Sequence, residues 1–283
     1  MKPDHPSRLL RLPSDGTLLV CTDLHGHLAD FERMVQIFRQ RGRAGERPYL
    51  LFTGDLIHGP NRSAEDWPPF LGDPYADQSV EVVDGFMALQ REAPGRVACL
   101  LGNHEHSHVG GPHTPKFWPD ETAHFEQEAG PSRTQLCQRL FRELPAVAAG
   151  PCGVAVTHAA PAARIAGPED IENLVYEGFE DLEIWSMAES RVLGALLWAR
   201  YCTPETARAF LGALARGGPP LGLVVYGHEI VPEGYRQVGD EQLVLSSSFG
   251  VPREQKFYLE LDLAGRYQSV ADLRVGREIM PLY

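Results

Sequence analysis

The stretch TLLVCTDLHGH, residues 17–27, decides the fold, because in it an apolar run leads directly into a polar turn. The apolar and β-branched residues of TLLVC predict a buried strand. Asp23 and His25 follow it two positions apart, so both side chains point to the same side and can hold one cation. A turn aspartate beside a solvated histidine gives the same pattern, so this motif alone indicates little.

Four further apolar runs end in the same way. They are YLLF (49–52) before TGD, VACLL (97–101) before GNHEH, GVAV (153–156) before THAA and LGLVVY (221–226) before GHE. Ligand sites of α/β sheets gather beyond the carboxyl ends of strands. The clusters together therefore predict one site, whose candidate residues are Asp23, His25, Asp55, Asn103, His104, His158 and His228.

Helical patterns connect these strands. Residues 28–42 and 80–92 carry apolar side chains at helical spacing, so strands and helices alternate along the chain. Such alternation predicts an α/β protein with a largely parallel sheet. Near the end, LVLSSSF (243–249) and KFYLELDL (256–263) predict two strands joined by GVPREQ, which favours antiparallel pairs there.

Composition indicates a globular protein that buries a sizeable core: the chain has 283 residues, of which 43% are hydrophobic and 23% charged. We expect a single domain over residues 1–283. The net charge of −12 disfavours a surface that binds nucleic acid through many phosphate contacts. Nothing in the sequence indicates an oligomeric state.

The cysteines and the apolar runs indicate the cellular compartment of the protein. Five scattered cysteines without a C-x-x-C pair favour a reducing environment over a disulfide framework or a zinc ribbon. The chain has no run of 18 apolar residues and no apolar signal region at its start. We therefore expect a cytoplasmic protein without a membrane partner.

Two segments, 59–78 and 106–121, look like insertions because they are rich in proline, glycine, aspartate and aromatic residues. Long irregular segments in a compact domain are usually functional. Since they begin just after Asp55 and Glu105, we expect both to shape the substrate cleft or a lid. The histidines in and beside the second segment are expected to be solvated: His106, His108, His113 and His124.

The donor types point to a metal centre. Aspartate, asparagine and histidine without a thiolate suit Mn, Fe or Zn better than a structural zinc or an oxygen-only calcium cage. These ligands are too many for one open catalytic ion. A two-metal site about 3.5–4 Å across needs a bridging carboxylate, and we assign that role to Asp55.

These motifs carry a resemblance. DLHG (23–26), GD (54–55), GNHE (102–105), His158 and GH (227–228), in this order, resemble the calcineurin-like dinuclear metallophosphoesterases. Within that superfamily the chain resembles the phosphoprotein phosphatase family of serine/threonine phosphatases, as a divergent bacterial-type member. The likeness spans roughly residues 17–265 and includes the stretches QSVEVV (78–83), FRELPAVAA (141–149), LLWAR (196–200) and GHEIVPEGY (227–235).

The resemblance implies a four-layer α/β/β/α sandwich of two mixed sheets flanked by helices. It implies that Asp23 and His25 bind the first metal ion and that Asp55 bridges to the second. The remaining ligands of the second ion are then Asn103, His158 and His228. A metal-activated hydroxide attacks phosphorus in line, and His104 is the general acid. The substrate is a phosphoprotein or a small phosphoester.

The sequence departs from the family at the second motif, where G-D-x-x-D-R-G becomes GDLIHG (54–59). His58 stands where the family has the aspartate that orients the catalytic histidine, and the phosphate-binding arginine is absent. We assign phosphate binding to Arg200, Asn103 and His58, since the guanidinium of Arg200 suits phosphate oxygens. Residues that could compensate from segment 59–78 are Arg62, Asp73 and Asp77.

Two other functions are open at this stage. The Gly-Pro pair after GDLIH resembles the symmetrical diadenosine tetraphosphatases, which favours a nucleotide hydrolase, although GNHE and GHEIVPEGY look closer to the protein phosphatases. The altered second motif instead allows a phosphate-binding pseudo-enzyme. The complete set of metal ligands weighs against that reading, because recognition alone has no chemical need for it.

Overall fold

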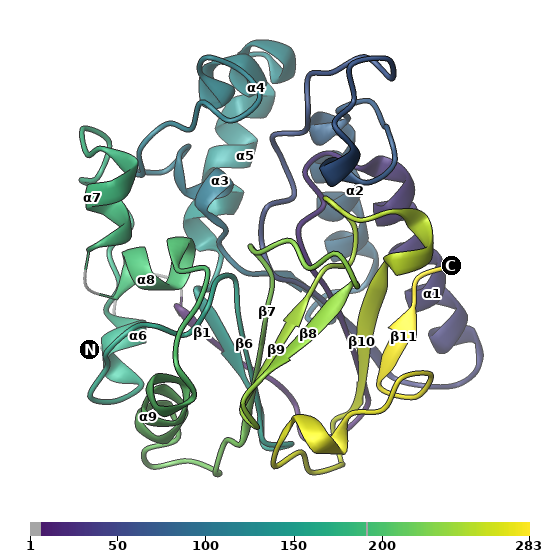
Figure 1. The fold of residues 1–283 in the computed structure, drawn as a ribbon, viewed down its shortest axis with the longest axis vertical. Coiled ribbons are helices and arrows are strands. Elements are labelled where there is room, and N and C mark those ends of the chain that lie inside the picture. The colour runs from purple at the N-terminus through teal and green to yellow at the C-terminus, as the bar shows by residue number, and fades with distance from the viewer. Residues whose placement is uncertain (1–6, 191) are drawn as a thin grey trace.

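The computed structural model describes residues 7–190 and 192–283, in which two mixed β-sheets pack face to face. The strand order is β1-β5-β6-β7-β9-β8 in one sheet and β11-β10-β2-β3-β4 in the other. Figure 1 shows α1 and α2 on one side of the sheets and α6, α8 and α9 on the other. The predicted α/β sandwich of two mixed sheets flanked by helices is therefore confirmed.

The strands are short, and most of their residues are buried. The first sheet contains β1 (Leu9–Arg11), β5 (Val147–Ala149), β6 (Val154–Thr157), β7 (Leu223–Tyr226), β8 (Tyr235–Val238) and β9 (Gln242–Leu245). The second contains β2 (Thr17–Cys21), β3 (Pro48–Phe52), β4 (Val97–Cys99), β10 (Phe257–Asp262) and β11 (Ile279–Pro281).

The longer helices are amphipathic and lie against these sheets. They are α1 (Leu28–Arg43), α2 (Ser79–Glu92), α4 (Glu121–Ala129), α5 (Pro131–Glu143) and α9 (Pro204–Leu214). Shorter α-helical turns are α3 (Asn103–His106), α6 (Glu169–Glu172), α7 (Ile184–Ala188) and α8 (Leu193–Trp198). Three 3₁₀ turns are η1 (Pro69–Leu71), η2 (Arg253–Gln255) and η3 (Val270–Asp272).

Three apolar layers hold these elements together. Between the sheets, side chains of β2 such as Val20 meet side chains of β6 and β7 such as Val156 and Val225. The outer face of the second sheet is covered by α1, α2 and α5, and that of the first by α8 and α9. Strands inside the sheets, such as β3 and β7, are thus buried on both faces, which explains why they are continuous apolar runs, whereas the edge strand β8 is partly exposed.

The structure corrects the prediction for the last strands of the chain. Both predicted strands exist, but β9 and β10 lie in different sheets, so GVPREQ (250–255) crosses between sheets and does not close a hairpin. At this end of the chain the antiparallel pairs are β8 with β9, β10 with β11 and β10 with β2, and elsewhere β5 pairs with β6 in the same way. Within the described ranges, no helix has both the length and the apolarity that crossing a bilayer requires.

Candidate metal centre

The polar clusters that follow β2, β3, β4, β6 and β7 meet at one rim of the two sheets. β2, β3 and β4 are parallel neighbours, as are β6 and β7, so within each set the carboxyl ends face the same rim. The described non-glycine residues with positive φ all belong to these clusters: Asp23, His25, Asp55, His58 and His228. Such backbone conformations cost about 1–3 kcal/mol each and concentrate at functional sites.

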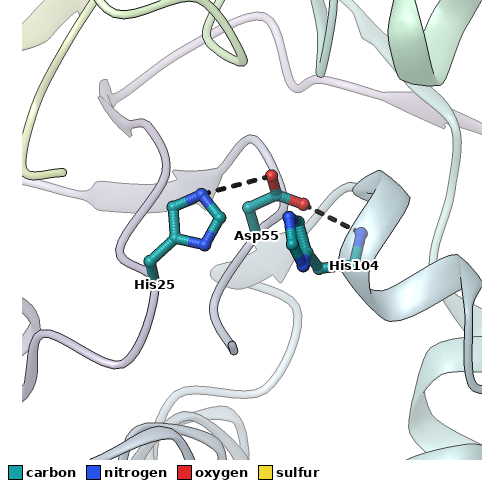
Figure 2. A group of neighbouring side chains, drawn as sticks. All are labelled: His25, Asp55 and His104. Atoms are coloured by element: carbon teal, nitrogen blue, oxygen red, sulfur yellow. Dashed lines mark hydrogen bonds and ion pairs between the residues drawn. The ribbon is translucent and has the colours of Figure 1, made fainter. Parts of the chain in front are cut away.

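Asp55 lies between the two halves of this rim. Its Oδ2 is 3.6 Å from the Nε2 of His25 and 3.6 Å from the Nε2 of His158. Its Oδ1 accepts a hydrogen bond of 3.2 Å from the backbone N–H of His104, as Figure 2 shows together with the contact to His25. Asp55 belongs to two groups of potential metal ligands, one with His25 and His104 and one with His158 and His228.

Backbone carbonyls fix which imidazole nitrogen faces the rim. The Nδ1–H of His25 donates to the carbonyls of Ile57 and His58, at 3.2 and 3.1 Å. The Nδ1–H of His158 donates to the carbonyl of Thr53 at 3.0 Å. The Nε2 lone pair of each ring is therefore left for a cation, an arrangement typical of histidines that bind metals.

The surroundings of His158 fit a cation more closely still. Its Nε2 lies 3.0 Å from the Oδ1 of Asn103 and 3.2 Å from the Nδ1 of His228. Because Nε2 carries a lone pair and Oδ1 is also an acceptor, these two atoms repel each other unless a cation lies between them. The residues present thus fit a bound metal ion.

Asp23 lies beside these donors but belongs to neither group, so its pairing with His25 on one cation stays a prediction. Its Oδ2 accepts from the backbone N–H of His228 at 2.8 Å, and its Oδ1 accepts from the Thr53 hydroxyl at 3.4 Å. Burial raises the pKa of Asp23 and of Asp55 to about 7. Nearby cations lower the pKa of carboxyl groups, so bound metal ions would keep both side chains ionised at neutral pH.

Glu105 holds two of the clusters together. Its carboxylate accepts from the backbone N–H groups of Asp55, Leu56 and Gly102 at 2.7–3.1 Å. It makes no hydrogen bond to the His104 ring, so it completes the turn that follows β4 and does not orient His104.

Four of the metal-ligand candidates line a cavity of about 300 Å³: His25, Asp55, Asn103 and His228. Its wall includes Asp55, His104 and the side chains of Lys116 and Arg200. The Nζ of Lys116 lies 4.4 Å from the centre of the Phe249 ring. A cation–π contact of this kind holds the ammonium group at the cavity. We did not predict Lys116 from the sequence, where a lone lysine in a proline-rich segment carries little signal.

The side chain of Arg200 also lines this cavity. Its Nη1 donates to Glu229 Oε2 at 2.9 Å and to the His228 carbonyl at 3.3 Å, and 62% of its side chain is exposed. The ion pair with Glu229 leaves other N–H groups of the guanidinium free for a ligand. Arg200 thus lines the cavity, and its role in phosphate binding stays a prediction.

His58 lies behind His104, away from the cavity. Its Nδ1 is 2.8 Å from the Nδ1 of His104, and its Nε2 is 3.0 Å from the Nε2 of His108. Both ring nitrogens are therefore engaged, and His58 is not among the residues that line the cavity. We accordingly do not retain His58 as a phosphate ligand.

Two histidines of the second inserted segment were placed wrongly by the sequence. His106 and His108 are 0% and 6% exposed, whereas we expected both to be solvated. The Nε2–H of His106 donates to the Tyr176 carbonyl at 2.8 Å. His108 packs against Phe125 and Phe141. Both rings are buried because long-range contacts fold the start of this segment into the protein.

The two inserted segments differ in whether they line the cavity. Segment 106–121 lines the cavity through Thr114, Pro115 and Lys116, but none of the described residues of 59–78 does so. Asp77 instead accepts from the Ser79 hydroxyl at 2.6 Å, and Ser79 Oγ accepts from the His58 backbone N–H at 2.9 Å. Arg62 and Asp73 are exposed. A larger hollow of about 510 Å³ lies between the segments and contains none of the metal-ligand candidates.

Comparison with known proteins agrees with this geometry. The sequence matches the calcineurin-like phosphoesterase family over residues 16–232. None of the curated proteins matches it significantly.

Solved structures share the fold at low sequence identity. A protein serine/threonine phosphatase from Saccharomyces cerevisiae is 19% identical with a TM-score of 0.56, covering 86% of this chain and 72% of its own. A cold-active protein-tyrosine phosphatase from a Shewanella species is 14% identical with a TM-score of 0.57, covering 92% of this chain and 78% of its own. At these identities the two structures indicate a common fold.

Proposed function

This chain belongs to the calcineurin-like phosphoesterase family and is a metal-dependent phosphoester hydrolase, and from that premise we propose that it is a phosphomonoesterase acting on phosphoserine and phosphothreonine in proteins. The observation that supports the proposal most strongly is the place of Asp55, 3.6 Å from both His25 and His158. His104 lies on the wall of the same cavity. The site thus offers donors for two cations beside a histidine that can transfer a proton.

We propose that two cations, Mn, Fe or Zn, bind at the rim. When bound, such ions supply a hydroxide nucleophile at neutral pH and offset the charge of the phosphoryl group. Mixed nitrogen and oxygen donors suit these first-row ions. The six residues that we assign to them are Asp23, His25, Asp55, Asn103, His158 and His228, with Asp55 shared between the two ions.

The other side chains of the cavity bind and protonate the substrate. Lys116 and Arg200 bind phosphate oxygens from two sides, and the Asn103 amide adds a donor. His104 gives a proton to the departing serine or threonine oxygen, because an alkoxide is a poor leaving group. Phe249 and Trp198 line the same cavity and limit the access of water.

Two alternatives differ in what they hydrolyse or bind. The Gly59–Pro60 pair is the feature that favours a dinucleoside polyphosphate hydrolase. A phosphate-binding pseudo-enzyme would bind phosphopeptides without turnover. Membership of a hydrolase family, together with a complete set of donors, favours an enzyme. The five free cysteines, all buried, are compatible with a reducing compartment, and we propose the cytoplasm.

The test begins with protein stripped by a chelator. Its rate on p-nitrophenyl phosphate is measured with and without added Mn, for the wild type, His104→Asn and His113→Asn. We expect Mn to restore turnover on p-nitrophenyl phosphate. On phenyl phosphate, which has a poorer leaving group, His104→Asn should lower kcat by about 10²–10⁴-fold, the usual contribution of a positioned proton donor. His113→Asn is the matched control, because the side chain of His113 is 49% exposed.

Substrate class is then compared at saturating Mn. The substrates are phosphoserine, phosphothreonine and phosphotyrosine peptides and a dinucleoside polyphosphate. Faster hydrolysis of the first two supports the proposal. A clear preference for phosphotyrosine or for the dinucleotide would contradict it, as would phosphopeptide binding without turnover of any substrate.

A further inference from the structure

Behind His104 lies a row of side chains that the proposed chemistry does not yet use. The Nδ1 atoms of His104 and His58 are 2.8 Å apart, and the Nε2 atoms of His58 and His108 are 3.0 Å apart. The Nδ1 of His108 lies 3.1 Å from Oε1 of Glu126 on α4. Four side chains from three separate stretches of sequence thus form one continuous hydrogen-bonded row.

The row leads from the cavity to the surface. The side chains of His104 and His108 are 4% and 1% exposed, whereas that of Glu126 is 35% exposed. Phe125 packs against the rings of both His58 and His108. The two inner histidines, His58 and His108, are therefore shielded from water, and their ring nitrogens form hydrogen bonds within the row.

The carboxylate sets the direction of every hydrogen bond in the row. The hydrogen bond from His108 lowers the pKa of Glu126, so Glu126 is ionised and can only accept. His108 then carries its proton on Nδ1, and its Nε2 accepts from the Nε2–H of His58. The Nδ1 of His58 is left as the acceptor for the Nδ1–H of His104, so one carboxylate determines three tautomers.

We propose that His58, His108 and Glu126 are positioning residues that orient His104 through this hydrogen-bonded row. The inference rests on the proposed function of His104 as proton donor to the leaving group. Because His104 donates its Nδ1–H to His58, its Nε2 faces the cavity, and the protonated ring gives the proton on Nε2 to the leaving group. Glu126 thus acts on His104 through the imidazoles of His108 and His58. This role explains why a histidine stands at position 58 in GDLIHG (54–59).

The other polar groups around His104 lie farther from its Nδ1 than His58 does. Thr114 Oγ1 and Glu121 Oε2 lie 3.4 and 3.7 Å from the Nδ1 of His104, both farther than His58. The atoms of His58, His104 and Glu121 are also close enough to hold a metal ion. Such an ion would replace the proton between the two histidines, so the experiment must separate these cases.

The first measurement uses the metal-free protein and does not depend on activity. Imidazole ¹⁵N spectra, assigned with single histidine variants, report which nitrogen carries the proton. We expect Nδ1–H on His108, Nε2–H on His58 and Nδ1–H on His104. Glu126→Gln should change these tautomers, and Glu128→Gln, at an exposed glutamate of the same helix, should leave them as they are. The opposite tautomers in the wild type would overturn the proposal.

The second measurement compares two leaving groups at saturating Mn. Because proton donation matters more for a poor leaving group, Glu126→Gln should lower kcat about tenfold on phenyl phosphate and less on p-nitrophenyl phosphate. That loss is part of the 10²–10⁴-fold that positioned proton transfer contributes. Equal losses on both substrates, or the same loss in Glu128→Gln, would contradict the proposal.

A double variant separates positioning from a structural role. His58→Asp places a carboxylate directly beside His104, so adding Glu126→Gln should then change kcat less than twofold. If Glu126 only stabilises α4, its tenfold effect persists in the His58→Asp background, and the proposal fails. A metal ion titrated onto His58 and Glu121, seen as a third bound equivalent that shifts the His58 resonances, would overturn it as well.

The outcomes also separate this inference from the proposed function. The expected tautomers in a protein that hydrolyses no phosphoester would leave the row in place and refute the phosphatase. Turnover that requires His104 but is insensitive to Glu126 would refute the row alone.

Discussion

The strand-end clusters and the inserted segments lie at the same rim but are held there by different means. Each metal-ligand candidate follows a strand within a few residues, and backbone hydrogen bonds fix its turn. The inserted segments 59–78 and 106–121 contact the rim mainly through side chains such as Tyr75, Lys116 and His108, and through one backbone hydrogen bond from Gln78 to Gly26.

This difference indicates which parts of the site can change independently. The packing of the sheet core fixes the positions of the metal-ligand candidates, so these side chains move only if the core moves. The inserted segments depend on a few side-chain contacts, so substrate binding and proton transfer can change without loss of the metal ions. The predictions below test this division, beginning with the largest expected effect.

The largest effect is expected at Asp55. Asp55→Asn removes the shared carboxylate, so metal content should fall and kcat should drop by more than 100-fold, beyond the roughly 10–100-fold cost of losing a group that only orients a ligand. Metal analysis and the rate on p-nitrophenyl phosphate check this. Asp66→Asn, at an exposed aspartate of segment 59–78, is the control and should change neither quantity.

Lys116 tests the inserted segment as a source of substrate contacts. Lys116→Ala should lower kcat/KM by about 10–100-fold, because a hydrogen bond to a charged group contributes about 1.5–3 kcal/mol. Metal content should stay at the wild-type level. Arg62→Ala removes an exposed cation from the other segment and should have no effect. A loss of metal in Lys116→Ala would show that the two regions are not independent.

His106 tests how the second inserted segment is anchored. Burial lowers the pKa of His106 to about 4, whereas an unfolded histidine titrates near 6.5. The unfolded chain therefore takes up the proton first, and this contribution to stability is lost as the pH falls from about 6.5 to about 4.

His106→Gln should remove that contribution. Between pH 6.5 and 5 the variant should lose about 1.5 kcal/mol less of its free energy of unfolding than the wild type, as measured by urea denaturation. His113→Gln, at an exposed histidine, should keep the wild-type pH dependence. Equal slopes in the wild type and His106→Gln would mean that His106 is not buried in solution.

Tyr75 should give the smallest effect. Its hydroxyl donates to the backbone carbonyl of His25 at 2.9 Å, so Tyr75→Phe should lower the free energy of unfolding by about 0.5–1.5 kcal/mol. Metal content and kcat should change less than twofold. Thermal melting and metal analysis check both, with Tyr201→Phe at an exposed tyrosine as control. A marked loss of metal would mean that segment 59–78 helps to place the donors.

Local pattern was enough to predict the strands that carry the donors. The stretch 17–21 is β2 itself, and 49–52 lies within β3. The apolar run and the polar turn are both local signals, and parallel strands bring their carboxyl ends to one rim. The strands β1, β5, β8 and β11 were not predicted, because these short segments do not belong to an apolar run that leads into a polar cluster.

By itself, the sequence determined the fold class, the order of the clusters and the residue types that face the rim, since each follows from neighbours along the chain. Only the tertiary structure decided that His58 meets His104 and His108, that His108 meets Glu126 and that Lys116 lies at the cavity. These contacts join residues up to 50 positions apart. A histidine or a lysine in an irregular segment has the same local sequence whether it is solvated or buried, so its partners are set by how the segment packs.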